Sequence, residues 1–317
     1  MARVLVTGGA GFIGSHVCQA LLARGDDVTI VDSFDPFYEE SVKRGNLAEV
    51  AGAGDCRLVE ADIRDRDRMT SLFAEGQFEA VVHLAAKAGV RPSIEDPAGY
   101  VSTNLDGSTV LFDLAVVHEI PRFVFASSSS VYGNNEKVPF CEDDPVDHPV
   151  SPYAATKKAG ELVAHTYHHV HGLNVTCLRF FTVYGPRQRP EMAIHKFTRL
   201  IDAGDPVPFF GDGTSRRDYT YVDDIVDGVL RSLDRCEGYR IYNLGESHTT
   251  TLARLVELIE AALGKKAVLD RLPFQRGDVQ ETFANISRAQ TELGYDPSTL
   301  VEEGIPKFVA WFRSRTQ

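Results

Sequence analysis

The sequence predicts an α/β fold in which helices cover both faces of a doubly wound parallel sheet. Strand-like and helix-like segments alternate through the first half of the 317-residue chain, and a glycine-rich turn joins the first strand to the first helix. The second half alternates less regularly and contains more turn formers, which predicts a smaller, mixed α/β lobe. We expect residues 1–180 to form the first domain and residues 181–317 mainly the lobe, with some segments returning to the first domain.

The turn after the first strand contains three regularly spaced glycines, Gly8, Gly11 and Gly14. In a strand–turn–helix unit the first glycine permits the tight turn, the second lets a pyrophosphate approach the backbone, and the third lets helix and strand pack closely. The amides at the start of the helix, around Phe12 and Ile13, then face the anion. This order of elements is typical of a Rossmann-type dinucleotide-binding domain.

A second strand, at residues 28–31, ends at Asp32. A carboxylate there accepts hydrogen bonds from both ribose hydroxyls of NAD and repels a 2′-phosphate, so NAD is the predicted cofactor. The alternative is a glycine-rich turn without a ligand, which the matching strand, helix and terminal carboxylate disfavour.

Further strand-like segments lie at residues 57–60, 80–84, 122–126 and 175–178. Helical patterns separate them at residues 65–74, 104–118 and 151–172. Ligands of parallel sheets bind beyond the carboxyl ends of the strands, so residues at and just after these ends are candidate binding residues. They are Asp62, Ile63, Leu84, Ala85, Ala86, Lys87, Ser128, Ser129 and Ser130.

One predicted helix carries a tyrosine and a lysine four residues apart. Ser151 can cap this helix, Pro152 suits its first position, and Gly172 ends it. Tyr153 therefore lies in the first turn, and Lys157 shares its face about 6 Å further along the axis. A cation so close favours the phenolate, so Tyr153 is expected to act as a base below its ordinary pKa of about 10. Taken alone, the pair is better interpreted as an ordinary surface tyrosine and lysine.

Composition limits the classes of partner. The net charge of −12 argues against nucleic acid and against an anionic membrane surface, and the apolar runs are too short to span a bilayer. The first strand begins almost at Met1, so we expect no signal peptide. The five cysteines have no metal-like spacing, and we expect reduced thiols, a cytoplasmic location and no metal site.

Six motifs spread over the chain resemble those of the extended short-chain dehydrogenase/reductases, and among them the nucleotide-sugar epimerases. They lie at residues 7–14, 62–65, 83–86, 127–133, 153–157 and 217–219. The resemblance implies tightly held NAD, a UDP-sugar substrate and a homodimer formed through the helices at 104–118 and 153–171. By motif position it makes Tyr153 and Lys157 the catalytic pair.

The same resemblance implies functions for further residues. Ser128 matches the residue that hydrogen-bonds the reacting hydroxyl, while Lys87 and Asn104 match positions near the nicotinamide ribose and its supporting network. Phe210 falls where the family packs the uracil, and Arg217 matches an arginine that binds the diphosphate. One more position resembles a contact to the uridine ribose, and it is Asp278.

The resemblance also implies a reaction. Tyr153 would take the proton of the sugar 4-hydroxyl, the C4 hydride would move to NAD, and its return to the opposite face of a 4-keto sugar would invert C4. Dehydratases of the family carry an Asp-Glu pair after the Ser128 position, and UDP-glucuronate decarboxylases carry a Glu before the Val-Tyr-Gly motif. Ser129 and Ser130 stand there, and serine is a poor acid or base, which favours epimerisation.

Two segments, residues 37–47 and 184–193, resemble the UDP-glucuronate 4-epimerases most. Thr182 stands where UDP-galactose 4-epimerases have Asn, so interconversion of UDP-glucuronate and UDP-galacturonate is the expected reaction. The residues expected to hold a C6 carboxylate are Ser129, Ser130, Thr182 and Arg189. The nearest alternative is epimerisation of UDP-glucose or its N-acetyl form. Dehydration, decarboxylation and a non-catalytic NAD-binding scaffold are less favoured.

Overall fold

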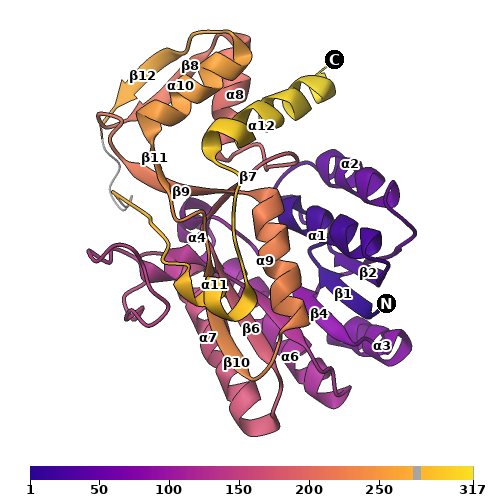
Figure 1. Cartoon of the computed structure of the whole chain (residues 1–317). Helices are drawn as coiled ribbons and strands as arrows, with labels where there is room; N and C mark the ends of the chain where they lie inside the picture. Colours follow the sequence, from indigo (N-terminus) through magenta and orange to yellow (C-terminus); the bar gives the residue numbers. More distant parts are fainter. Residues whose placement is uncertain (274–279, 317) are drawn as a thin grey trace.

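The computed structural model describes residues 1–273 and 280–316. At its centre is a seven-stranded parallel sheet with the strand order β10-β6-β5-β4-β1-β2-β3 (Figure 1). The strands are β1 (Arg3–Thr7), β2 (Asp27–Asp32), β3 (Arg57–Glu60), β4 (Ala80–His83), β5 (Phe123–Ser128), β6 (Val175–Phe180) and β10 (Tyr239–Leu244). The order reverses between β1 and β4, so the predicted doubly wound Rossmann-type fold is confirmed.

Helices cover both faces of this sheet. One face carries α1 (Phe12–Ala23), α2 (Glu40–Ala51) and α9 (Val222–Asp234), and the other α3 (Arg66–Gly76), α6 (Gly107–Val117) and α7 (Pro152–His171). Side chains of β1 divide between the two cores, since Val4 and Val6 belong to the first and Leu5 to the second. A buried parallel strand must be apolar on both faces, which explains its continuous apolar run.

Helix α7 begins and ends as its sequence predicts. The Ser151 hydroxyl accepts a hydrogen bond from the Ala154 amide at 3.1 Å, and Gly172 ends the helix with a left-handed φ of 73°. The predicted helix at 104–118 differs, because Ser102–Asp106 form a wider π-helical turn before α6. Such turns are frequent at functional sites, and this one contains the buried Asn104.

A smaller lobe is grouped above the main sheet in Figure 1. Its elements are β7 (Thr182–Tyr184), α8 (Ala193–Ala203), β8 (Pro206–Phe210), β9 (Arg216–Tyr221), β11 (Thr249–Thr251), α10 (Leu252–Leu263), β12 (Val268–Leu272) and α12 (Val301–Thr316). Strands β11, β9 and β7 form one small sheet, and β12 and β8 another. Two other segments of the second half of the chain pack on the first half, since β10 pairs with β6 and α9 packs on α1. The domain division at residue 180 stays a prediction.

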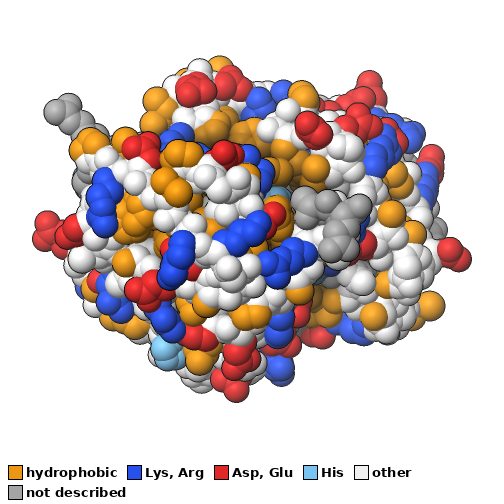
Figure 2. Space-filling view, turned by 90° about the horizontal axis from the view of Figure 1, so that it is seen from above, with side chains coloured by type: hydrophobic (Ala, Val, Ile, Leu, Met, Phe, Trp, Pro, Cys, Tyr) orange, Lys and Arg blue, Asp and Glu red, His pale blue; other side chains and the backbone are white. Residues whose placement is uncertain are grey.

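The remaining described elements are short. They are α4 (Val90–Glu95), α5 (Pro97–Val101), the 3₁₀ turn Ser129–Tyr132 and α11 (Ser287–Leu293). Among residues 1–273 and 280–316, no helix is both long and apolar enough to cross a bilayer. Figure 2 shows Lys and Arg interspersed with Asp and Glu over the face that it draws.

The buried imidazole of His83 is expected to make the fold sensitive to mild acid. Its Nδ1 lies 2.7 Å from Thr7 Oγ1 and its Nε2 2.9 Å from Ser108 Oγ, and burial, with the charge of Lys157, lowers its pKa to about 3. Below about pH 6.5 the unfolded chain binds a proton that the folded chain excludes, so the free energy of unfolding falls by about 1.4 kcal/mol per pH unit.

Urea titrations between about pH 7 and about pH 5 measure this loss. In His83→Gln the free energy of unfolding should fall less over this pH range, because the contribution of one buried imidazole is removed. In the exposed control His171→Gln it should fall as in the wild type. An unchanged decline in His83→Gln would contradict the assignment.

Candidate active site

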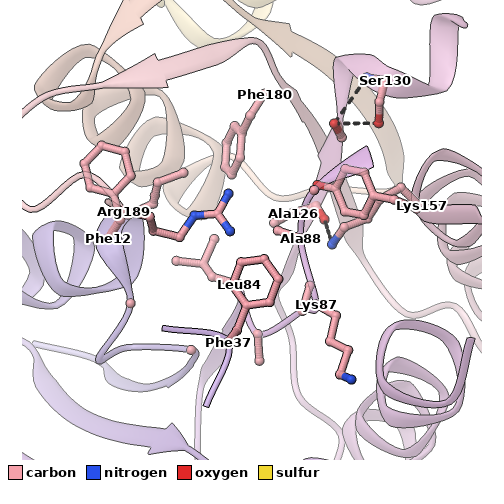
Figure 3. A pocket seen from close by; sticks show the side chains of 18 of the residues that line it. Phe12, Phe37, Leu84, Lys87, Ala88, Ala126, Ser130, Lys157, Phe180 and Arg189 are labelled. Carbon is pink, nitrogen blue, oxygen red and sulfur yellow. Dashed lines mark hydrogen bonds between the residues drawn. The ribbon is translucent and has the colours of Figure 1, made fainter. Parts of the chain in front are cut away.

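A cavity of about 570 Å³ lies where the carboxyl ends of the main strands face the smaller lobe (Figure 3). Segments that follow six of the main strands meet there, as expected for a sheet of this topology. The predicted site residues that line it are Gly8, Gly11, Phe12, Ile13, Gly14, Asp32, Asp62, Ile63, Leu84, Ala85, Ala86, Lys87, Ser128, Ser129, Ser130, Tyr153, Lys157, Thr182, Arg189 and Arg217.

Phe210 lies beside these lining residues. Phe210 ends β8, and its ring centre lies 5.8 Å from the guanidinium of Arg91, which does line the cavity. Asp278 lies outside the described residues. The expected contact between Phe210 and a uracil would therefore lie on the lobe side of the cavity, beside Arg91.

Asn104 lies behind the cavity wall, with 2% of its surface exposed. Its side chain accepts a hydrogen bond from the Lys87 amide at 2.8 Å and donates one to the Lys87 carbonyl at 2.9 Å. A third bond runs from its Nδ2 to Thr156 Oγ1 at 3.1 Å. Asn104 therefore joins the loop after β4 to α7 next to Lys157, and the Lys87 ammonium pairs with Asp96 at 2.8 Å.

The glycine turn is shaped to receive a phosphate. Gly8 has a φ of 74°, and a Cβ there would lie 2.7 Å from the Ala85 amide nitrogen. A Cβ on Gly14 would lie 2.1 Å from the Gly8 carbonyl oxygen, so only glycine fits at either position. Helix α1 begins at Phe12 without a side-chain cap on Gly11, which leaves its first amides to an anion.

Asp32 is held at the end of β2, 6% exposed, on the cavity wall. Its carboxylate accepts hydrogen bonds from the amides of Ala10 at 3.2 Å and Phe34 at 2.9 Å. Lys43 Nζ lies 3.2 Å from the same carboxylate. These contacts fix the orientation of a group that suits a ribose diol.

Tyr153, Lys157 and Ser128 converge at one wall of the cavity. Lys157 Nζ donates a hydrogen bond to the Ala126 carbonyl at 2.8 Å and lies 6.0 Å from the centre of the Tyr153 ring (Figure 3). Ser128 forms a hydrogen bond with Tyr153 and accepts bonds from the Ser130 amide at 3.2 Å and hydroxyl at 2.9 Å. A hydroxyl between them would meet a base and a hydrogen-bonding partner together.

The electrostatics of this group differ from the sequence-based expectation. Burial raises the pKa of Tyr153, and the hydrogen bond with Ser128 and the charge of Arg189 offset this effect only in part. Burial also lowers the pKa of Lys157 to about 8. The predicted lowering of the Tyr153 pKa by Lys157 is therefore wrong for this structure, because helical spacing does not report the cost of burying a phenolate. A phenolate here requires another positive charge beside it.

Arg189 reaches into the cavity from the loop after β7. In Figure 3 its guanidinium points between the rings of Phe37 and Phe180. It lies 5.5 Å from the centre of the Phe37 ring and forms an ion pair with Glu191 at 3.0 Å. A guanidinium in such an apolar setting is suited to bind a carboxylate, with which it forms strong charge-assisted hydrogen bonds.

The chain is similar to known proteins over nearly its whole length. Residues 4–245 match the NAD dependent epimerase/dehydratase family. The chain belongs to this family. UDP-glucuronate 4-epimerase 4 of Arabidopsis thaliana is 46% identical over 329 residues, which cover 98% of this chain and 75% of that protein. The family expected from the motifs is confirmed.

Two solved structures of epimerases have nearly the same fold. The UDP-glucuronic acid 4-epimerase of Bacillus cereus, in complex with UDP-glucuronic acid and NAD, is 34% identical with a TM-score of 0.92, covering 98% of this chain and 99% of that one. The UDP-glucose 4-epimerase of Thermotoga maritima, with UDP-glucose, is 34% identical with a TM-score of 0.92, covering 99% of each. The chain is thus equally similar to structures of two different UDP-sugar epimerases.

The cavity also contains residues for which the sequence predicted no individual function. Among them are Phe37, Lys43, Arg64, Arg91 and Phe180. The available signal was position, since Arg64 and Arg91 lie in segments that follow strands. Cations are also common on surfaces, so position did not distinguish them. Within the part of the chain that the structure describes, no three His, Cys, Asp or Glu side chains gather to hold a metal ion.

A buried ion pair lies behind the cavity wall that carries Tyr153. Glu161 of α7 accepts hydrogen bonds from Ser127 Oγ at 2.6 Å and from Arg179 Nε and Nη2, each at 2.8 Å. Neither charged side chain is more than 1% exposed. Burial alone would raise the pKa of Glu161, but Arg179 brings it below its ordinary value. Because Tyr153, Lys157 and Glu161 share one helix face, this pair fixes the position of that face of α7 against β5 and β6.

Proposed function

We propose that the protein interconverts UDP-glucuronate and UDP-galacturonate by epimerisation at C4, with NAD as bound cofactor. The observation that carries this proposal is one cavity that joins Tyr153, Ser128 and Arg189 to a glycine turn suited to a dinucleotide. The Arabidopsis relative named for this reaction and the Bacillus cereus structure with UDP-glucuronic acid and NAD support it.

The residues of the cavity fit NAD. The turn from Gly8 to Gly14 would hold the pyrophosphate, Asp32 the adenosine ribose, and Asp62 and Ile63 the adenine. Lys157 suits the second ribose. When bound, oxidised NAD supplies a hydride acceptor and a positively charged ring, the additional charge that a Tyr153 phenolate requires.

Proton transfer falls to Tyr153 and Ser128. The Tyr153 oxygen removes the proton of the sugar 4-hydroxyl as C4 is oxidised, while the Ser128 hydroxyl hydrogen-bonds the same oxygen. After the keto sugar turns over within the cavity, the phenol returns the proton. Ser129 and Ser130 occupy the positions where elimination of water or loss of CO₂ would need a carboxylic acid, which favours epimerisation.

The C6 carboxylate selects the substrate in this proposal. Arg189 supplies the cation, and Thr182, Ser129 and Ser130 supply hydroxyls on the same cavity. On the lobe side Arg217 would bind the diphosphate and Phe210 the uracil. The residue proposed for the uridine ribose is Asp278.

Incubation with UDP-glucuronate should give UDP-galacturonate, detected by proton NMR of the anomeric signals. The kcat/KM for UDP-glucose should be at least about tenfold lower, because a neutral hydroxymethyl group loses the charge-assisted hydrogen bonds of Arg189. Arg189→Met should remove most of this preference, and Arg254→Met, an exposed arginine of α10, should not. Turnover of UDP-glucose without any galacturonate from UDP-glucuronate would contradict the assigned substrate.

We also propose a homodimer formed through α6 and α7. Support comes from exposed apolar side chains on α7 and on α5, which packs against it, since Leu162 is 56% and Val101 45% exposed. Light scattering should give about twice the chain mass of 34.9 kDa. Leu162→Glu should give the single-chain mass and the control Leu300→Glu on the lobe should not, while a wild-type monomer would contradict the dimer.

A reducing compartment such as the cytoplasm is our proposed location. All five cysteines are free thiols, and they are Cys18, Cys56, Cys141, Cys177 and Cys236. Oxidising compartments favour disulfide formation, so free thiols support this location.

A further inference from the structure

The loop that carries Arg189 contains a buried arginine that points elsewhere. Residues 185–192 connect β7 to α8. Within this loop Arg187 is 3% exposed and Gln188 1% exposed, whereas Arg189 lines the cavity. The side chains of Arg187 and Gln188 are therefore buried against neighbouring elements, whereas the next side chain, Arg189, faces the cavity.

The Arg187 side chain contacts helices α1 and α2. Its Nη2 donates hydrogen bonds to Gln19 Oε1 at 2.8 Å and to His16 Nδ1 at 2.6 Å, both on α1. His16 Nε2 lies 2.9 Å from the Pro186 carbonyl oxygen and 3.0 Å from Arg187 Nε. Glu49 of α2 lies 3.7 Å from Arg187 Nε. The loop is thus attached to α1 by its backbone and by a side chain.

Backbone geometry indicates that these contacts hold the loop. Arg187 has a φ of 65°, a left-handed conformation that persists for non-glycine residues when the surroundings enforce it. The next residue is fixed on the other side, because Gln188 Nε2 donates to the Val183 carbonyl at 3.1 Å and its Oε1 accepts from the His195 amide at 3.2 Å. Because the two preceding residues are held in this way, the backbone position of Arg189 is restricted.

The Arg189 side chain has weaker direct support. Its ion pair with Glu191 is made within the same loop, and its guanidinium lies over the Phe37 ring. A loop that shifts would carry Arg189 and Glu191 together. The position of the guanidinium in the cavity therefore depends on what anchors the loop.

We propose that Arg187 is a positioning residue for substrate specificity. By anchoring residues 185–192 to α1, it places the Arg189 guanidinium where a carboxylate on the sugar C6 is bound. The inference rests on the proposed function. His16 lies two residues after Gly14, so the same anchor joins the carboxylate-binding loop to the helix that begins at the dinucleotide turn.

The test measures kcat and KM for UDP-glucuronate and UDP-glucose, and compares the ratio of the two kcat/KM values. Arg187→Met should lower this ratio about tenfold, mainly through a higher KM for UDP-glucuronate, because the charge-assisted hydrogen bonds of Arg189 are then misplaced. The exposed control Arg254→Met should keep the wild-type ratio. A general loss of stability would lower both kcat/KM values and leave their ratio unchanged, which would overturn the proposal.

A double-mutant cycle with Arg189→Met separates positioning from an independent effect. Once Arg189 is absent, Arg187→Met should change the ratio no further, since both act through one guanidinium. An equal additional loss in the double variant would overturn the proposal. If Arg187→Met does not fold, Gln19→Leu removes one acceptor and is judged by the same ratio. A wild-type enzyme that makes no galacturonate would refute the proposed function itself, whereas an active wild type with an unchanged Arg187→Met ratio would refute only the anchor.

Discussion

Tyr153→Phe is expected to lower kcat by about 10²–10⁴-fold, the usual contribution of a positioned general base. The phenylalanine ring keeps the shape of the cavity wall and removes the oxygen that accepts the sugar proton. Binding of NAD and of the UDP-sugar should persist, because the glycine turn and Arg189 are untouched. Initial rates with UDP-glucuronate and calorimetric titration with the same ligand measure the two properties separately.

Tyr100→Phe is the matched control for this variant. The Tyr100 ring contacts the Tyr153 ring with 6.2 Å between centres, but its hydroxyl donates to the Ala88 carbonyl at 2.9 Å. We expect this control to keep most of its turnover. Wild-type rates in Tyr153→Phe would refute the assigned base, and equal losses in both variants would indicate a packing effect.

Glu161→Leu is expected to lower the free energy of unfolding by about 3–5 kcal/mol. The substitution leaves the Arg179 guanidinium buried without its counter-charge, and it removes the acceptor of the Ser127 hydroxyl. Urea denaturation followed by circular dichroism measures the change. The exposed control Glu75→Leu, whose partner is Arg57, should leave the free energy of unfolding nearly unchanged, because solvent screens an exposed ion pair.

The double variant with Arg179→Met tests the cause of this loss. With both charges removed, an apolar pair of similar volume should restore most of the stability, because the main penalty is the unpaired charge. Equal instability of the single and double variants would show that packing around α7, not charge, dominates. A single variant as stable as the wild type would contradict the importance of the pair.

Local features were predictable from the sequence. The start of α7 follows from Ser151 and Pro152, and the tight turn before α1 follows from the spacing of its glycines, because both depend on residues that are close in the chain. The parallel arrangement of the main sheet follows from the alternation of strands and helices, whereas the order of its strands comes from the structure alone.

Long-range pairings were not predictable in the same way. Glu161 and Arg179 lie on different elements, and Arg187 reaches His16 across most of the chain. Nothing in the local sequence distinguishes these charged residues from surface ones. The prediction of a lowered pKa for Tyr153 was wrong for a related reason. Burial raises this pKa, and burial is a property of the assembled cavity that helical spacing does not report.

In the proposed reaction C4 is oxidised and then reduced while the sugar stays within one cavity. The most direct test uses UDP-glucuronate carrying deuterium at C4, with the product analysed by NMR and mass spectrometry. We predict UDP-galacturonate that keeps the deuterium at C4, because the hydrogen removed from that carbon returns to it without exchange with water. Product with protium at C4, or recovery of unchanged UDP-glucuronate alone, would contradict the account.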